Sequence, residues 1–199
     1  MAIEKSEIKR KLVHILFGVV VVIMLKFGLI GWLHIFFLTI IGIVISFLCK
    51  KYNIPFVNYC LNVLERNENL RKFPGKGVVF YFVGIFLILL FFPNNLDIVM
   101  AAILILAFGD TAGYIFGVEF GRIKHPFTDK KFLEGMVAGI IAGFLGAIIF
   151  VPWHEAIIAS FFAMVAEGIE IKIGLEEVDD NIVMPLVAAV SIWAVRVLF

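Results

Sequence analysis

Charged residues are scarce in this 199-residue sequence: Asp, Glu, Lys and Arg make up 17% of it, while 62% is hydrophobic. The mean hydropathy is +1.07. A soluble domain of this length is nearer half apolar, so the excess apolar surface has to face lipid. The formal net charge is only +1, which gives no indication of a nucleic acid or of a broadly acidic partner. The composition therefore predicts an integral membrane protein.

Cysteine is nearly absent as well. Cys49 and Cys60 are the only two cysteines, and their spacing does not match a metal site. We interpret them as reduced thiols at the membrane face. No small-residue cleavage pattern follows the first apolar stretch, so we expect no cleavable signal peptide. Internal repeats and low-complexity tracts are also lacking, and we expect a single membrane-embedded domain over residues 1–199.

Long apolar runs separated by polar segments dominate the chain. A helix needs about 20 apolar residues to cross a bilayer, with about 17 as the lower limit. The runs are too long for barrel strands, and lipid offers no partner for unpaired backbone groups, so they must be helical. The fold class predicted is all-α, a polytopic membrane helix bundle with about seven transmembrane helices, of which the first, third, sixth and last are short. The runs are Leu12–Leu25, Leu29–Cys49, Val78–Phe92, Ile98–Val118, Phe132–Val151, Ala156–Ile169 and Ile182–Val195.

The basic residues indicate how the chain is oriented. With the N-terminus in the cytoplasm, all of the 17 Lys and Arg residues except Lys26 and Arg196 fall in cytoplasmic segments. This is a strong positive-inside bias. The connections on the opposite side are short and nearly uncharged. We therefore expect a multi-pass protein of the cell membrane with a cytoplasmic N-terminus and its chemistry at the cytoplasmic face.

One mixed segment, Phe56–Leu70, is neither fully apolar nor disordered. It combines Leu61 and Leu64 with polar and charged residues. It fits either a short interfacial helix, ended by Pro74 and Gly75, or a simple connecting loop.

Asp110 is the most informative single residue. It lies within an otherwise apolar helix, where an acidic residue costs about 2.5–3.5 kcal/mol on insertion scales. Such a residue has to be paired, face a polar cavity or bind a cation. The alternative is an Asp that reaches the interface or caps a helix.

Glycines recur at every fourth residue on both sides of the loop that follows Asp110. Rows of small residues at this spacing let two helix backbones approach closely. Beside the acidic residues, Gly109 and Gly135 would also leave room for a ligand. The two rows are Gly109, Gly113, Gly117 and Gly121, and then Gly135, Gly139 and Gly143.

The loop between these helices is basic. Such a loop normally contacts anionic lipid head groups, but here Asp110 precedes it and Glu134 follows it. Carboxylates can hold Mg²⁺, and lysines act as point charges on phosphate oxygens. These groups suit a magnesium–nucleotide substrate and phosphoryl transfer, which needs mainly positioning and charge neutralisation. The basic residues are Arg122, Lys124, His125, Lys130 and Lys131.

Two further polar groups lie near helix ends. Lys11 and His14 form one stripe entering the first apolar run; the basic residues there could equally set the topology, and His14 could be a packing hydrogen-bonder. Glu167 ends the sixth run. Asp180 opens the last run, where residues 179–181 can also cap the helix. Glu167 and Asp180 could complete an acidic metal site.

With these motifs in this order, the chain resembles the CTP-dependent polyprenol kinases, which include dolichol kinase, phytol kinase and the CTP-using diacylglycerol kinase. Each motif is short, but their order and spacing together are fairly specific. One departure is Phe132, which stands where that family usually has Ser or Thr. The matching residues are Arg10, Lys11 and His14; the stretch Gly75–Gly84; Gly109, Asp110, Ala112, Gly117 and Gly121; Lys130, Lys131, Glu134 and Gly135; and Glu167, Asp180 and Asn181.

The resemblance implies transfer of the γ-phosphate of CTP to the hydroxyl of a lipid alcohol with a divalent metal, Mg²⁺. The alcohol stays open among polyprenol, dolichol-like, phytol-like and other isoprenoid or glycerolipid alcohols. Either a carboxylate or His14 could accept the proton of the alcohol. The metal ligands expected are Asp110, Glu134, Glu167 and Asp180. The residues expected at the nucleotide and its phosphates are Arg10, Lys11, Gly109, Gly117, Arg122, Lys130, Lys131 and Gly135.

Two other functions remain as alternatives. Phosphatidate cytidylyltransferases resemble the same central motifs and use CTP and Mg²⁺, but they attack the α-phosphate and carry a later tail motif that this chain lacks. In a transporter or channel, Asp110, Glu134 and Glu167 would line an ion path. These acids and the basic loop all fall toward one face, however, which favours the kinase.

Overall fold

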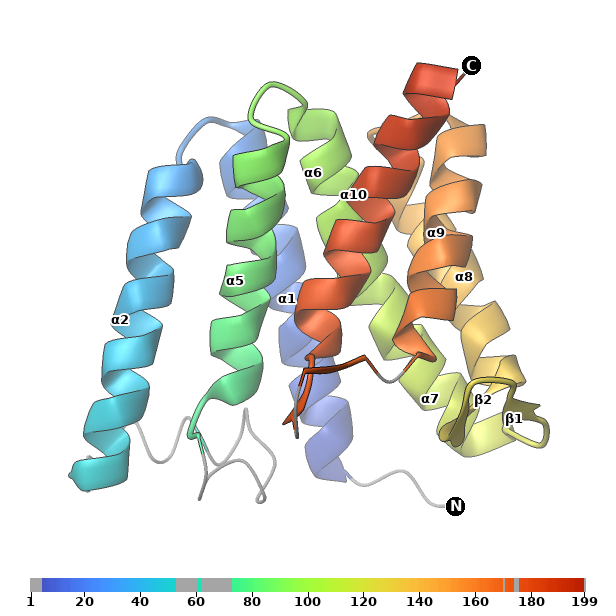
Figure 1. Ribbon diagram of the computed structural model, residues 1–199, viewed down its shortest axis with the longest axis horizontal. Helices are drawn as coiled ribbons and strands as arrows, with labels where there is room; N and C mark the ends of the chain where they lie inside the picture. Colours follow the sequence, from blue (N-terminus) through green and yellow to red (C-terminus); the bar gives the residue numbers. More distant parts are fainter. Residues whose placement is uncertain (1–4, 53–60, 62–72, 170, 174–175, 199) are drawn as a thin grey trace.

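The computed structural model describes residues 5–52, 61, 73–169, 171–173 and 176–198. Cys60 and nearly all of the segment Phe56–Leu70 lie outside the described residues. Within the described part of the chain, helices form an all-α bundle, and each of the predicted apolar runs corresponds to one of them (Figure 1). This confirms the predicted fold class. The helices are α1 (Lys5–Lys26), α2 (Trp32–Lys51), α5 (Lys76–Phe91), α6 (Leu96–Leu104) continuing through the π-helix η1 (Ile105–Gly109) into α7 (Asp110–Phe120), α8 (Leu133–Ala147), α9 (Trp153–Glu167) and α10 (Asp180–Leu198).

Length and composition suit three of the described helical stretches for crossing a membrane: Trp32–Cys49, Leu96–Phe120 and Asp180–Leu198. The apolar helices α5 and α8 are shorter than the limit for a full span. Successive helices run in opposite directions, so the N-terminus lies at one end of the bundle and the C-terminus at the other (Figure 1).

The continuous helix α6–η1–α7 is the centre of the bundle. Residues 98–107 are almost completely buried, because α1, α8, α9 and α10 all pack against this helix. In contrast, α2 packs mainly on α5 and exposes apolar side chains such as Phe37 and Phe47. Exposed apolar residues on an outer helix are what a lipid environment permits.

The π-helix η1 ends directly before Asp110. A π-turn adds a residue to one turn of the helix, and such turns occur frequently at functional sites. It changes the direction in which the following side chains project. This turn could not be predicted from the sequence, because Ile105–Gly109 is apolar like the rest of the helix.

The predicted basic loop contains a β-hairpin. Strand β1 (Lys124–His125) pairs antiparallel with β2 (Thr128–Phe132). The buried ring of His125 fixes the hairpin against the end of α9, since a Cβ at Gly168 would lie only 1.9 Å from its Cε1. A second short pair, β3 (Lys172–Ile173) with β4 (Glu176–Glu177), precedes α10.

The end of the bundle opposite the hairpin carries more charge interactions than predicted. Its connections were expected to be nearly uncharged, but Arg196 forms a partly buried ionic cluster there. Its Nε lies 3.0 Å from both carboxylate oxygens of Glu155, and its Nη2 donates to Asp97 at 2.5 Å. The cluster ties the last turn of α10 to the first turns of α6 and α9.

Candidate active site

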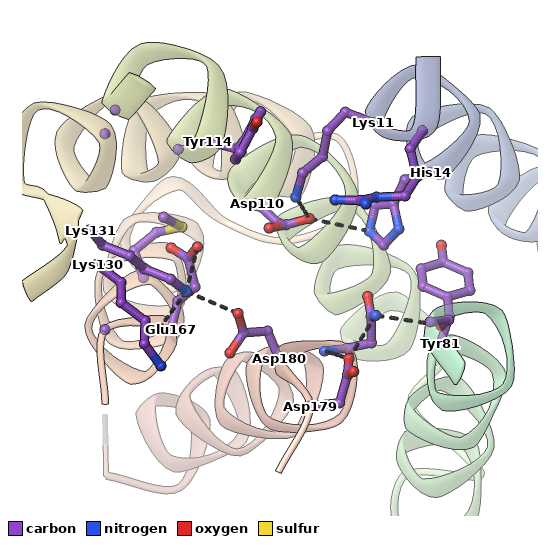
Figure 2. Close-up of a pocket in the computed structure, with 18 of the residues that line it drawn as sticks. Lys11, His14, Tyr81, Asp110, Tyr114, Lys130, Lys131, Glu167, Asp179 and Asp180 are labelled. Carbon is purple, nitrogen blue, oxygen red and sulfur yellow. Dashed lines mark hydrogen bonds and ion pairs between the residues drawn. The ribbon is translucent and has the colours of Figure 1, made fainter. Parts of the chain in front are cut away.

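A cavity of about 550 Å³ opens at the hairpin end of the bundle. Residues 10–17 of α1 and the starts of α5 and α10 line it, together with α7, the hairpin and the adjoining ends of α8 and α9 (Figure 2). Four carboxylates, Asp110, Glu167, Asp179 and Asp180, share this cavity with several basic side chains. The structure therefore brings together groups that the sequence places as far as 170 residues apart. The basic residues are Arg10, Lys11, Lys76, Lys130 and Lys131.

Asp110 is paired with the first helix. The Nζ of Lys11 donates to Asp110 Oδ2 at 2.5 Å, and Lys11 is only 8% exposed although it is charged. His14 lies on the same stripe of α1, with its Nε2 3.9 Å from the same carboxylate oxygen (Figure 2). The polar stripe predicted for this helix thus faces the intramembrane acid.

Lys131 joins two of the other carboxylates. Its Nζ lies 2.9 Å from Glu167 Oε1 and 2.9 Å from Asp180 Oδ2, and it also donates to the carbonyl oxygen of Glu167 at 2.7 Å. Burial alone would lower the pKa of Lys131, but the charges of Glu167 and Asp180 outweigh it and raise that pKa above its usual value. Lys131 is therefore a permanent cation held between two acids.

The start of α10 is fixed by its own residues and by α5. Asp179 Oδ1 accepts hydrogen bonds from the backbone N–H and the side-chain amide of Asn181, at 3.1 and 2.8 Å. This is the capping role predicted for this segment. A Cβ at Gly84 would lie 2.1 Å from the carbonyl oxygen of Asn181. Only a glycine allows α5 to approach so closely, and this approach places Asp180 at the cavity.

The two glycine rows pack against each other, as the sequence predicts. A Cβ at Gly135 would lie 2.4 Å from the carbonyl oxygen of Gly113, and one at Gly139 would lie 2.8 Å from that of Gly109. Gly117 and Gly135 also line the cavity. Gly109 is buried in the helix contact and is not among the lining residues, so its position is explained by packing.

Glu134 and Arg122 lie apart from the carboxylates of the cavity. The carboxylate of Glu134 accepts hydrogen bonds from the backbone amides of Arg122 and Ile123, at 3.0 and 3.2 Å from Oε1. Both Glu134 and Arg122 border a separate surface hollow between the end of α7 and the start of α8. Here Glu134 holds the chain that leads into the hairpin, and the neighbouring Gly135 faces the cavity instead.

The acidic residues fit a hard cation by their chemistry. Asp110, Glu167 and Asp180 offer only oxygen donors, the type that Mg²⁺ prefers. The ammonium groups of Lys11 and Lys131 lie against these oxygens, so the lysines already neutralise the carboxylate charges that a metal ion would neutralise. Among the described residues, no group of three or more His, Cys, Asp or Glu side chains is close enough together to hold a metal ion. A metal at Asp110, Glu167 or Asp180 would have to displace the lysine that contacts that carboxylate.

Several lining residues were missed by the sequence analysis. Tyr81 and Tyr114 lie within apolar or glycine-rich runs, where an aromatic residue is typical of membrane packing. Lys76 was considered only as a residue that sets topology, and Asp179 only as a cap. His125 was noted in the basic loop, but its burial depends on the hairpin, which the sequence did not reveal.

A helix bundle whose lysines and carboxylates meet in one cavity at its edge is the framework of a membrane-embedded enzyme. The chain is 32% identical to an uncharacterised protein of Methanocaldococcus jannaschii, over 92% of this chain and 91% of that protein. It is 28% identical to a phytol kinase of Synechocystis, over 98% of this chain and 82% of that protein.

It is also 27% identical to CTP-dependent diacylglycerol kinase 1 of Saccharomyces cerevisiae, over 74% of this chain and 51% of that protein. No protein-family model matches the chain, and no solved structure matches it. With these similarities, which cover 74–98% of the chain, the protein belongs to the family that includes the phytol kinases and the CTP-dependent diacylglycerol kinases. This confirms the family resemblance of its motifs.

Proposed function

We propose that the protein transfers the γ-phosphate of CTP to the hydroxyl of a membrane lipid alcohol, with Mg²⁺, at the cytoplasmic face of the cell membrane. One observation carries the proposal. A single cavity combines cations suited to phosphate, carboxylates suited to Mg²⁺ and, on α1 and α5, the apolar side chains of Phe17 and Phe82. A site that binds both a nucleoside triphosphate and a lipid alcohol requires these three kinds of surface.

The lysines change partners when the nucleotide binds. In this structure Lys11 and Lys131 neutralise carboxylates. Phosphate oxygens compete for the same ammonium groups, because lysine binds phosphate as a point charge. Once a lysine turns to phosphate, its carboxylate becomes available for Mg²⁺, which when bound supplies further neutralisation of the phosphate charge. The exchange replaces one set of charge pairs with another and leaves no buried charge unpaired.

Two groups are candidates for accepting the proton of the alcohol. Asp110 lines the cavity, and His14 Nε2 lies 3.9 Å from its Oδ2. Both are within reach of a hydroxyl placed between α1 and α7. Lys130, Arg10 and Lys76 stand at the same end of the cavity and add positive charge for the triphosphate.

The proposed orientation follows from charge. The hairpin and the N-terminus lie at the same end of the bundle (Figure 1), and this end carries most of the basic residues of the sequence. The positive-inside rule assigns such an end to the cytoplasm, where CTP is present. The names of two relatives, phytol kinase and CTP-dependent diacylglycerol kinase, support an isoprenoid or a glycerolipid alcohol as the acceptor.

The experiment uses membranes that contain the protein, Mg²⁺ and a panel of phytol, a polyprenol and dioleoylglycerol. CTP is labelled at the γ-phosphate in one reaction and at the α-phosphate in another, and the organic phase is counted. We expect label only from the γ position, with one alcohol preferred. Label from the α position would instead identify a cytidylyltransferase. No label from either would contradict the proposal and favour a transporter.

A further inference from the structure

Two residues that line the cavity, His14 and Tyr81, each bury a polar atom that has no hydrogen-bond partner: Nε2 of His14 and the hydroxyl of Tyr81. Their rings meet edge to face, with centroids 4.8 Å apart (Figure 2). Buried polar groups nearly always have a partner, and one that lacks it destabilises the fold. Among the described residues, Ser160 Oγ is a third such atom, but it does not line the cavity.

His14 and Tyr81 occupy a boundary between charged and apolar surface. On the hairpin side, Arg10 of α1 and Lys76 of α5 line the cavity about one turn away. On the other side, deeper in the bundle, the lining residues of the same two helices are Phe17 and Phe82. The two helices therefore present charge, then a polar pair, and then aromatic surface along their length.

The aromatic end of this surface continues to the outside of the bundle. Phe17 is 38% exposed, and α1 packs mainly on α6 while α5 packs mainly on α2 and α10. Gly18 lies next to the polar pair, where a Cβ would be 2.9 Å from the hydroxyl of Tyr81. The same Cβ would lie 2.7 Å from the Cβ of Ala107, so only a glycine lets the Tyr81 hydroxyl approach the backbone of α1 this closely.

We infer that His14 and Tyr81 form the subsite for the hydroxyl of the acceptor lipid, whose chain leaves the cavity between α1 and α5 past Phe17 and Phe82. This inference rests on the proposed function and specifies which part of the cavity takes which substrate. The triphosphate then occupies the end lined by Lys131, Glu167 and Asp180.

The chemistry of an alcohol matches the two free atoms. A hydroxyl both donates and accepts, so it can accept a hydrogen bond from the hydroxyl of Tyr81 and donate one to Nε2 of a neutral His14. A fully ionised phosphate group has no proton to donate, so it could not satisfy Nε2 of a neutral His14. Asp110 lies beside His14, so an alcohol bound there is next to the carboxylate that faces the phosphate end.

Tyr81→Phe tests this inference, because it removes the hydroxyl and keeps the ring that contacts His14. Loss of one neutral hydrogen bond corresponds to about a tenfold effect. We expect KM for the lipid alcohol to rise about tenfold while KM for CTP stays unchanged. Ser160→Ala is the matched control, since it removes another buried hydroxyl without a partner, away from the cavity; both KM values should stay as in the wild type. An unchanged lipid KM in Tyr81→Phe, or an equal rise for CTP, would overturn the inference.

A second measurement needs no phosphate transfer. A Phe17→Trp reporter in nanodiscs is titrated with phytol and, separately, with phytane, the hydrocarbon that lacks the hydroxyl. We expect the tryptophan emission to shift at about tenfold lower phytol than phytane concentration, and this preference to disappear when Tyr81→Phe is added. Equal responses to both lipids in the reporter itself would overturn the subsite. If the hydroxyl preference is seen but no γ-label is transferred by the wild type, the proposed function fails and the lipid subsite stands.

Discussion

Lys131→Met would remove the cation that contacts both Glu167 and Asp180, and would leave the buried carboxylate of Glu167 unpaired. Lys131 donates three hydrogen bonds, to the carbonyl and carboxylate of Glu167 and to Asp180. A hydrogen bond to a charged group contributes about 1.5–3 kcal/mol. The side chain of Lys131 is 33% exposed and that of Asp180 43%, so solvent screens part of this energy. We therefore expect a loss of about 2–3 kcal/mol in the free energy of unfolding.

Replacing Glu167 by Gln in the same variant separates the structural role of Lys131 from its role at the phosphates. The double variant has no unpaired buried charge, so its stability should recover by at least half. Kinase activity should remain low in both variants, because neither has the cation for phosphate. Stability is measured by SDS titration in mixed micelles with circular dichroism, and activity by transfer of γ-label.

Lys124→Met provides the control in the same hairpin. Lys124 contacts the exposed carbonyl of Asp129 and does not line the cavity, so we expect less than about 1 kcal/mol of destabilisation and normal activity. The reasoning would be refuted if Lys131→Met unfolded like the wild type. It would equally be refuted if Glu167→Gln restored the activity of Lys131→Met.

Further predictions concern the hairpin and the opposite end of the bundle. Gly168→Ala should displace the ring of His125, since the new Cβ would lie 1.9 Å from it. We expect activity to fall at least tenfold while the helix content is retained. As the control, Gly31→Ala places no atom within 4 Å of the new Cβ and should leave activity unchanged. Burial lowers the pKa of His125, so the folded protein favours the neutral form of the ring. The stability that the neutral ring contributes is therefore present above about pH 6.5 and is lost as the pH falls below that value. His125→Gln should flatten this part of a pH–stability curve. Arg196→Met should cost about 3–5 kcal/mol, because it leaves the buried Glu155 unpaired, whereas the activity of the folded fraction should stay normal; a stable Arg196→Met would argue against the ion pair.

The helices could be predicted from the sequence because their signal is local. Lipid requires a continuous apolar run, so Leu29–Cys49 marks α2 within a few residues. The π-turn at Ile105–Gly109 could not be predicted in this way, since one added residue in a turn leaves the apolar pattern unchanged. The hairpin was also missed, because its strands are too short to show an alternating pattern.

The members of the site were easier to predict than their contacts. Charged residues at the membrane edge stand out by the cost of burying them, and this singled out Asp110, Lys131 and Glu167. Which lysine meets which acid depends on how distant helices pack, as in the contact between Lys11 and Asp110. Tyr81 gave no signal, because a tyrosine in an apolar run is equally suited to packing.

The direction of a side chain at a helix start was also beyond the sequence. Glu134 and Gly135 are neighbours at the beginning of α8, yet only Gly135 faces the cavity. The hydrogen bonds from the backbone of Arg122 and Ile123 turn the carboxylate of Glu134 toward the other side. These bonds exist only because the chain folds back into the hairpin between the two positions.

The kinetics of Asp110→Asn test most directly that this cavity is the site of phosphate transfer. The substitution keeps the size of the side chain and removes the charge beside Lys11 and His14. We expect the rate of γ-label transfer to fall at least about a hundredfold, the size of the effect when one preorganised electrostatic group is removed from an active site. Asp97→Asn, the same change at the opposite end of the bundle, should retain most of the activity. Full activity of a correctly folded Asp110→Asn protein would contradict the account.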